Sequence, residues 1–150
     1  MTGPRVISGF GDLRYADGGF RTDGPHNGID LAWAPGYPVI AAADGDIVVL
    51  RENDGLCGNL IIIQHTAEYR SVYCHVDVPF KKPYGAVKRG EVIADLAYTT
   101  RQGGNQHLHY SLRTYGQNID PLKMIVGCFD PKRTYPDDPF SPTYPVPCKD

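Results

Sequence analysis

The stretch NLIIIQHTAEYRSVYCHV, from Asn59 to Val76, reads as two short strands joined by a turn. Its two halves, Asn59–His65 and Tyr69–Val76, are rich in Ile, Val and Tyr, the residues that strands favour. Convincing amphipathic helix periodicity is missing from the rest of the chain. The sequence therefore predicts a β-hairpin here and an antiparallel all-β fold around it.

Segments on both sides of this hairpin also read as short strands. Asp44-Gly45 is a strong two-residue turn signal between Pro38–Ala43 and Asp46–Leu50, which predicts another hairpin. Further elements are expected downstream: a strand over Glu91–Tyr98, a polar loop over Thr99–Gln106, a last clear strand over His107–Arg113 and one helical turn over Leu122–Val126.

The composition changes at Gly127, beyond which Pro, Asp and Tyr predominate. We therefore expect one domain over residues 1–126 and an irregular Pro-rich tail over residues 127–150 that lies along it. With 150 residues in all, the chain is long enough to be held by a hydrophobic core alone. The expected architecture is a compact antiparallel sheet or open barrel-like domain.

Four cysteines, which allow three pairings if all are oxidised, lie at Cys57, Cys74, Cys128 and Cys148. They lack the CxxC spacing of a structural zinc knuckle. Cys128 and Cys148 bracket the tail, so a disulfide between them would restrain it, and this is the pairing we expect. Four buried free thiols are the alternative.

The overall charge and hydropathy exclude two classes of partner. A formal net charge of −2 without a basic stripe argues against a nucleic-acid partner. Lys81–Lys82 and Lys88–Arg89 are isolated pairs that read as solvated loop charges. No apolar run approaches the roughly 18 residues needed for a membrane-spanning helix.

A His-x-His pair is the first sign of chemistry. Along a strand, His107 and His109 would project from one face, while the apolar residues Leu108, Tyr110 and Leu112 would face a core. Imidazole is both a common metal ligand and a group that titrates near neutral pH. The pair therefore suits a metal site or an acid–base site, and two ordinary surface histidines are the alternative.

A second motif, His26-Asn27-Gly28-Ile29-Asp30, adds two more donors. In an extended chain, the spacing of four places His26 and Asp30 on the same side. A turn in which Asp30 caps backbone amides is the alternative. Together with one histidine of the His-x-His pair, they make three protein ligands for zinc and leave a fourth position for water, as in a catalytic site.

Two further histidines are interpreted differently. Strand alternation places His75 on the same face as Tyr73 and Ser71, and near a metal it could hydrogen-bond the attacking water or the developing oxyanion. His65 lies just before the hairpin turn and is interpreted as a turn residue.

The order of these motifs resembles the lysostaphin-type (LytM-like) peptidoglycan metallopeptidases. The resemblance covers roughly residues 6–123. It extends over five blocks: the His26–Leu31 segment with Ala34–Val39 and Ala42–Gly45, Gly58-Asn59 and its strand, Tyr73–His75, Val87–Ile93, and His107–His109 with Ile119–Pro121. The chain departs from the family pattern at Gln106, at Tyr110-Ser111, and at Cys74 and Val76 around the middle histidine.

The resemblance implies roles for five residues. His26, Asp30 and His109 match the zinc ligands, and His107 and His75 match the two catalytic histidines. It also implies one Zn²⁺ ion and a zinc-dependent endopeptidase that hydrolyses peptide cross-links or bridges of peptidoglycan. A non-catalytic relative that activates a separate cell-wall amidase is the alternative, and an unrelated metal-binding β-domain is a third reading.

The expected partners are the stem or bridge peptides of peptidoglycan, and we expect a monomer. The family works outside the cytoplasmic membrane, in the periplasm or secreted. No signal peptide is visible after Met1, which leaves open a trimmed enzyme, a phage lysin and a delivered toxin. The sequence also leaves open whether a direct stem-peptide bond or a glycine bridge is cut.

Overall fold

The computed structural model describes residues 2–14, 19–21, 24–98, 107–136 and 138–149, and these contain strands and two 3-10 turns but no α-helix. The all-β class expected from the sequence is confirmed. No helix in this part of the chain is long and apolar enough to cross a membrane. The elements are β1 (Val6–Ser8), β2 (Ile29–Ala32), β3 (Pro38–Ile40), β4 (Gly45–Asp54), η1 (Gly55–Cys57), β5 (Gly58–Gln64), β6 (Tyr69–Cys74), β7 (Gly85–Val87), β8 (Val92–Asp95), β9 (His107–Thr114), β10 (Gln117–Ile119) and η2 (Pro121–Lys123).

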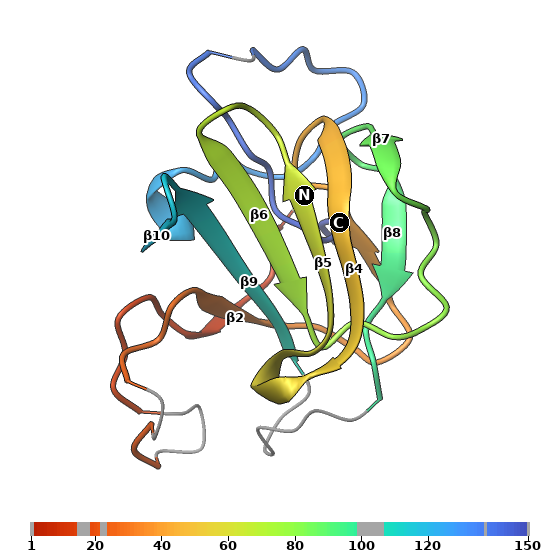
Figure 1. Ribbon diagram of the computed structural model, residues 1–150. Coiled ribbons are helices and arrows are strands. Elements are labelled where there is room, and N and C mark those ends of the chain that lie inside the picture. The colour runs from red at the N-terminus through yellow and green to blue at the C-terminus, as the bar shows by residue number, and fades with distance from the viewer. Residues whose placement is uncertain (1, 15–18, 22–23, 99–106, 137, 150) are drawn as a thin grey trace.

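Eight strands form one antiparallel sheet in the order β1-β2-β9-β6-β5-β4-β7, with β10 also paired to β9. Figure 1 shows β9, β6, β5 and β4 side by side. The hairpin expected from Asn59 to Val76 is confirmed as β5 and β6, in which Leu60 pairs with Cys74. Strand β9 lies between β2 and β6, so the His-x-His segment occupies the middle of the sheet.

The hairpin expected around Asp44-Gly45 is wrong. Strand β3 pairs with β8 in a separate two-stranded sheet, whereas β4 pairs with β5 and β7. Gly45 is needed for another reason: a Cβ there would overlap the Gln64 carbonyl oxygen and lie 2.8 Å from the Ile63 side chain. The glycine thus permits the close approach of β4 and β5 instead of a chain reversal.

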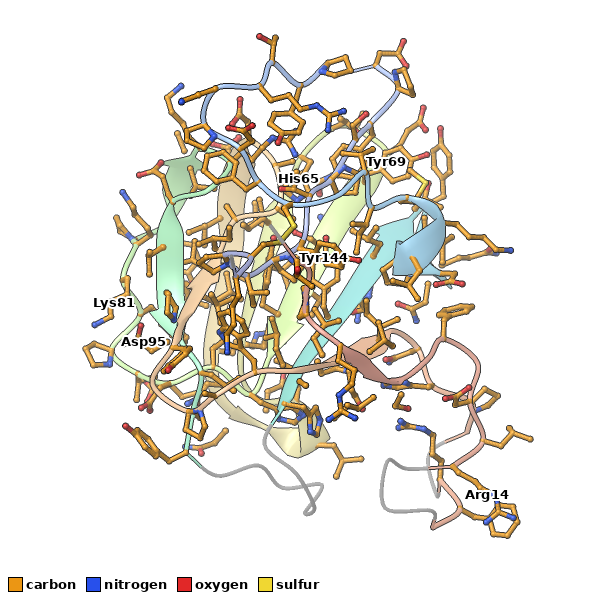
Figure 2. The ribbon with its side chains drawn as sticks, turned by 180° about the vertical axis from the view of Figure 1, so that it is seen from behind. Arg14, His65, Tyr69, Lys81, Asp95 and Tyr144 are labelled. Carbon is orange, nitrogen blue, oxygen red and sulfur yellow. A yellow bond between two sulfur atoms is a disulfide. The ribbon has the colours of Figure 1, made fainter. Side chains whose placement is uncertain are left out.

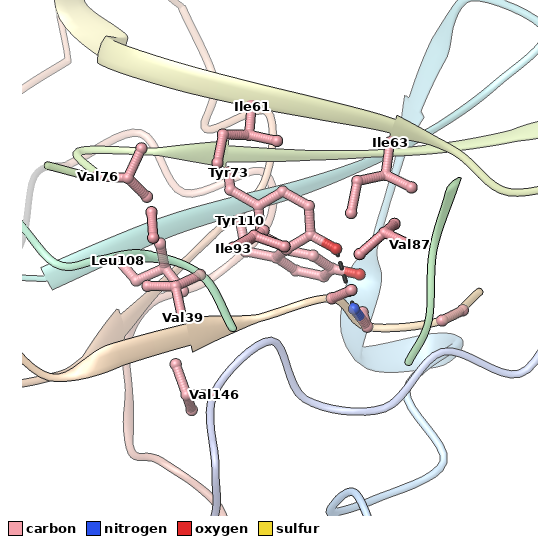
Figure 3. Close-up of a cluster of buried hydrophobic side chains, with 14 of the residues drawn as sticks. Val39, Ile61, Ile63, Tyr73, Val76, Val87, Ile93, Leu108, Tyr110 and Val146 are labelled. Carbon is pink, nitrogen blue, oxygen red and sulfur yellow. Dashed lines mark hydrogen bonds between the residues drawn. The ribbon is translucent and has the colours of Figure 1, made fainter. Parts of the chain in front are cut away.

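The main core lies between the small sheet and one face of the large sheet. Val39 and Ile93 from the small sheet belong to the same buried cluster as Leu108, Tyr110 and Leu112 of β9. Figure 3 shows this cluster, with the rings of Tyr73 and Tyr110 packed together. The face predicted to carry the apolar residues of β9 is therefore confirmed.

The opposite face of the large sheet carries a smaller apolar cluster. It consists of Leu60, Ile62, Val72 and Cys74. Cys74 is disulfide-bonded to Cys57, so the alternative of four free thiols is wrong. We call this side of the sheet the groove face, because a pocket of about 390 Å³ opens on it.

The C-terminal segment packs closely against the body of the protein. Phe140 and Val146 are buried in the main core, and the Cys128–Cys148 disulfide expected from the sequence is present. Backbone bonds join the segment to the strands, with Thr143 N–H donating to Ala42 O and Ile40 N–H donating to Pro145 O.

Arg89 was expected to be a solvated loop charge, and this expectation is wrong. Its guanidinium donates to the carbonyls of Ala42 at 2.7 Å and Ser141 at 2.8 Å, and it lies over the ring of Tyr135. Arg89 therefore ties the C-terminal segment to the sheet. Lys81, in contrast, is partly exposed beside Asp95, as Figure 2 shows.

Candidate metal centre

The pairing of β2 with β9 brings two of the expected ligands together. Asp30 and His109 are register partners in this antiparallel ladder. Gly28, just before β2, allows the strands to meet, because a Cβ there would overlap the Tyr110 carbonyl oxygen and lie 2.9 Å from the Ser111 Cβ. The glycine in the His26–Asp30 motif therefore has a packing role next to the ligands.

His26, Asp30 and His109 converge at a single point. His109 Nδ1 lies 2.9 Å from Asp30 Oδ1, and His26 Nε2 lies 3.1 Å from both of these atoms. All three side chains are buried. Residues separated by up to 83 positions in sequence thus present two nitrogens and one carboxylate oxygen to a common centre.

The distances among these three atoms can be compared with a zinc coordination sphere. Zn–N and Zn–O bonds of about 2.0–2.2 Å place tetrahedral ligand atoms roughly 3.3–3.5 Å apart. The three atoms lie 2.9–3.1 Å apart, so zinc binding would require them to move apart by only a few tenths of an ångström. The donor set therefore fits a zinc ion.

The side chain of His26 is held from behind. Its Nδ1 lies 3.0 Å from the Gly9 carbonyl oxygen, which can only accept a hydrogen bond, so Nδ1 carries the proton and Nε2 offers its lone pair to the centre. The His26 backbone is bonded to the same loop, with its N–H donating to Asp12 O. The imidazole is therefore oriented with Nε2 towards Asp30 and His109.

The local electrostatics favour the protonation states that bind a metal. Burial by itself raises the pKa of Asp30, but its contacts with the imidazoles of His109 and His26 outweigh burial and hold the pKa well below its usual value. Burial lowers the pKa of His109, against the opposing pull of the Asp30 carboxylate. An ionised carboxylate and a neutral imidazole are the forms that ligate divalent ions.

Two residues around the centre were missed by the sequence reasoning. Arg21 Nη2 lies 3.6 Å from Asp30 Oδ2 and donates to Ser8 Oγ, which in turn lies 3.2 Å from His26 Nδ1. Arg21 thus contacts the oxygen of Asp30 that faces away from the histidines. Neither residue belongs to a motif near the ligands in sequence, so no local signal marks them.

His107 and His75 lie beside the three candidate ligands. His107 Nε2 is 3.7 Å from Asp30 Oδ1, and the His75 ring centroid is 4.9 Å from that of His107 and 6.4 Å from that of His109. Both are buried, at 3–4% exposure. All five histidine and aspartate positions expected from the sequence therefore form one cluster.

His75 reaches this cluster by a route that the sequence did not indicate. Strand alternation was expected to place it with Tyr73, but Tyr73 lies in the main core while His75 lines the groove-face pocket with Cys74. The cause is the backbone of His75, whose φ of 67° is left-handed and ends the alternation of β6. Val76 consequently returns to the main core.

His65 lies elsewhere, as expected for a turn residue. Its Nδ1 is 2.8 Å from Asp44 O and its Nε2 is 2.6 Å from Ser71 Oγ. In Figure 2 it lies with Tyr69 beneath the C-terminal segment, and both rings pack on Phe140.

The groove-face pocket extends away from the candidate ligands. His26, His75 and His109 line one part of it, and Arg113, on the same face of β9, lines another. Among the described residues, neither Tyr98 nor Tyr115 is part of its wall, and both are exposed. The polar loop expected over Thr99–Gln106 lies outside the described residues.

Comparison with known proteins identifies the family. Residues 24–121 match peptidase family M23, and this range includes all five clustered residues. The chain belongs to family M23. The LytM-like resemblance of the sequence is thereby confirmed.

Relatives of this M23 domain have two kinds of described role. It is 36% identical over 99 residues to the peptidoglycan DD-endopeptidase ShyB of Vibrio cholerae, covering 66% of this chain and 23% of that protein. It is also 35% identical over 104 residues to the murein hydrolase activator NlpD of Escherichia coli, covering 69% and 27%. Matches to the first curated relatives span 20–30% of their length.

Among solved structures, a zinc-containing peptidase from Vibrio cholerae is similar to this M23 domain. The two superpose with a TM-score of 0.66 and 33% identity, over 78% of this chain and 35% of that one. The fold described above is therefore shared with a zinc-containing peptidase of known structure.

Proposed function

We propose that this M23 domain is a zinc-dependent endopeptidase that hydrolyses peptide cross-links or bridges of bacterial peptidoglycan. His26, Asp30 and His109 would hold the ion, and His107 and His75 would act as acid–base groups. The observation that carries the proposal is the convergence of two imidazole nitrogens and a carboxylate oxygen within about 3 Å of one another, beside two further histidines.

Each group has a distinct part in hydrolysis. Zinc bound at this centre would supply a Lewis acid that activates water and polarises the scissile carbonyl. An imidazole nitrogen of His107 or His75 accepts a proton from the attacking water and later donates it to the leaving amine nitrogen. The pocket beside His75 offers room for the peptide, and the buried setting strengthens these electrostatic interactions.

A second candidate function is activation of a separate cell-wall amidase without catalysis. The similarity to the murein hydrolase activator NlpD favours it. The complete set of candidate ligands and acid–base histidines argues for the enzyme, because a purely regulatory surface has no need for a buried metal centre.

Digestion of purified peptidoglycan distinguishes the two functions. An enzyme should release uncross-linked muropeptides by itself, and His109→Ala should abolish both release and zinc binding. His107→Ala should keep zinc but lose most of the cleavage. If the wild type releases no muropeptides alone yet stimulates an added amidase, and His109→Ala does the same, the protein is an activator and not an endopeptidase. Mass spectrometry of products from walls with direct and glycine-bridged cross-links identifies the bond.

We also propose in which compartment the domain works and which residues form it. Two disulfides support work outside the cytoplasm, in the periplasm or secreted, because such bonds are rare in the reducing cytosol. We propose a monomer with a catalytic domain over residues 1–126. Residues 127–150 form a tail that contributes Phe140 and Val146 to its core.

A further inference from the structure

A disulfide lies directly beside one of the proposed acid–base histidines. Cys74 is the last residue of β6 and precedes His75, and its sulfur is bonded to Cys57 in the η1 turn between β4 and β5. Cys74 is also the register partner of His109 in the β6–β9 ladder. The bridge therefore links the turn after β4 to the strand position next to a candidate metal ligand.

The backbone of His75 is fixed on both sides in an unfavourable conformation. A left-handed φ of 67° is unfavourable for a residue with a side chain, so surrounding contacts must maintain it. The His75 N–H donates to the carbonyl of Cys57 at 2.9 Å, and the His75 carbonyl accepts from Ala97 N–H at 2.9 Å. The acceptor for the His75 amide is thus the same residue that the disulfide attaches to Cys74.

We propose that the Cys57–Cys74 disulfide is a positioning device for His75. By tethering Cys57 next to Cys74, it keeps the Cys57 carbonyl within reach of the His75 amide and so maintains the left-handed turn. That turn directs the imidazole towards His107 and the groove-face pocket instead of the main core. This inference rests on the proposed function, in which His75 transfers protons. Cys57 and Cys74 are positioning residues and not catalytic ones.

The chain contains its own control. The Cys128–Cys148 disulfide closes a loop of similar length, with a sequence separation of 20 compared with 17, but it restrains the C-terminal segment. The entropic stabilisation by the two bridges should therefore be similar. Only the Cys57–Cys74 disulfide should affect the conformation of His75.

The experiment uses the Cys128→Ala/Cys148→Ala variant, in which one disulfide remains and a phosphine reductant can open it reversibly. Four quantities are measured in the oxidised, reduced and reoxidised protein: zinc content, kcat and KM on muropeptide dimers, and hydrogen exchange of the His75 amide. The Cys57→Ala/Cys74→Ala variant, with the other bridge intact, repeats the test without a reductant.

We expect opening of the Cys57–Cys74 bridge to lower kcat about tenfold or more, since a misplaced acid–base group loses part of a contribution of roughly 10²–10⁴-fold. Zinc content and KM should stay within about twofold, the His75 amide should exchange faster, and reoxidation should restore both kcat and protection. Removal of the Cys128–Cys148 bridge alone should leave kcat and His75 exchange unchanged.

Two results would overturn the inference: unchanged exchange of the His75 amide in the reduced protein, or a fall in kcat that merely follows loss of zinc or global unfolding. If the wild type cuts no peptidoglycan fragment, the proposed function fails. The exchange measurement then decides by itself whether the bridge positions His75.

Discussion

Asp30 and His109 face each other as register partners across β2 and β9, with Asp30 Oδ1 and His109 Nδ1 2.9 Å apart. Two of the three candidate ligands are thus set by a strand ladder, which is more rigid than a loop. The third, His26, precedes β2 and is oriented by the loop that contains Gly9 and Asp12. The geometry of the centre therefore depends on how closely β2 approaches β9.

Gly28→Ala tests this dependence. The added Cβ would overlap the Tyr110 carbonyl, so we expect a loss of about 1–3 kcal/mol in the free energy of unfolding, together with weaker zinc binding. Chemical denaturation and zinc titration measure the two effects. Gly9→Ala is the control, because the nearest atom to its Cβ would be Asp12 Oδ1, at an ordinary contact distance of 3.6 Å, and its stability should change by less than about 0.5 kcal/mol. Equal behaviour of the two variants would contradict the prediction.

Two packed tyrosines should respond in opposite ways to loss of their hydroxyl groups. Within the described part of the chain, the buried Tyr110 hydroxyl has no hydrogen-bond partner, whereas the Tyr73 hydroxyl accepts from Ala42 N–H and from Ser71 Oγ. Tyr110→Phe should raise the free energy of unfolding by about 1 kcal/mol, and Tyr73→Phe should lower it by a similar amount. Thermal and urea unfolding measure both changes. A destabilising Tyr110→Phe would point to a bound water at that hydroxyl.

His65 should make stability depend on pH below neutrality. Burial, opposed by the hydrogen bond to the Asp44 carbonyl, lowers the pKa of His65 from 6.5 to about 4. The unfolded chain therefore binds a proton that the folded protein does not. The contribution is fully present above pH 6.5 and is lost as the pH falls towards 4, by up to about 3 kcal/mol.

His65→Gln isolates this effect, because glutamine does not titrate. Urea unfolding of the wild type and the variant at several pH values gives the difference in their free energies of unfolding. That difference should shrink as the pH falls from 6.5 to 4, while the titration of all other groups cancels. A constant difference would contradict the assigned pKa.

The sequence predicted the elements whose signal is local and periodic. The β5–β6 hairpin and the two faces of β9 follow from alternating residues, and the five clustered residues follow from the order of motifs. The sequence did not predict which distant segments pair with each other. Nothing near Asp44-Gly45 indicates that β3 turns to β8, because that choice depends on contacts with residues about 50 positions away.

The position of His75 shows a second limit. A strand pattern assumes regular backbone angles, and the left-handed backbone of His75 places its side chain on the face opposite to the one that alternation predicts. The Cys57–Cys74 bridge and the contact of Arg21 with Asp30 likewise arise only when separate segments of the chain meet in space. Local chemistry was therefore predictable, whereas the contacts that orient it were not.

Zinc titration of metal-free protein tests the central claim most directly. After complete removal of metal, cleavage of muropeptide dimers should be absent and should return in proportion to added zinc, with the break at one equivalent per chain. The Asp30→Asn variant should show neither the break nor the cleavage. Full activity of the metal-free protein, or tight stoichiometric zinc binding by Asp30→Asn with activity intact, would contradict a zinc centre built from His26, Asp30 and His109.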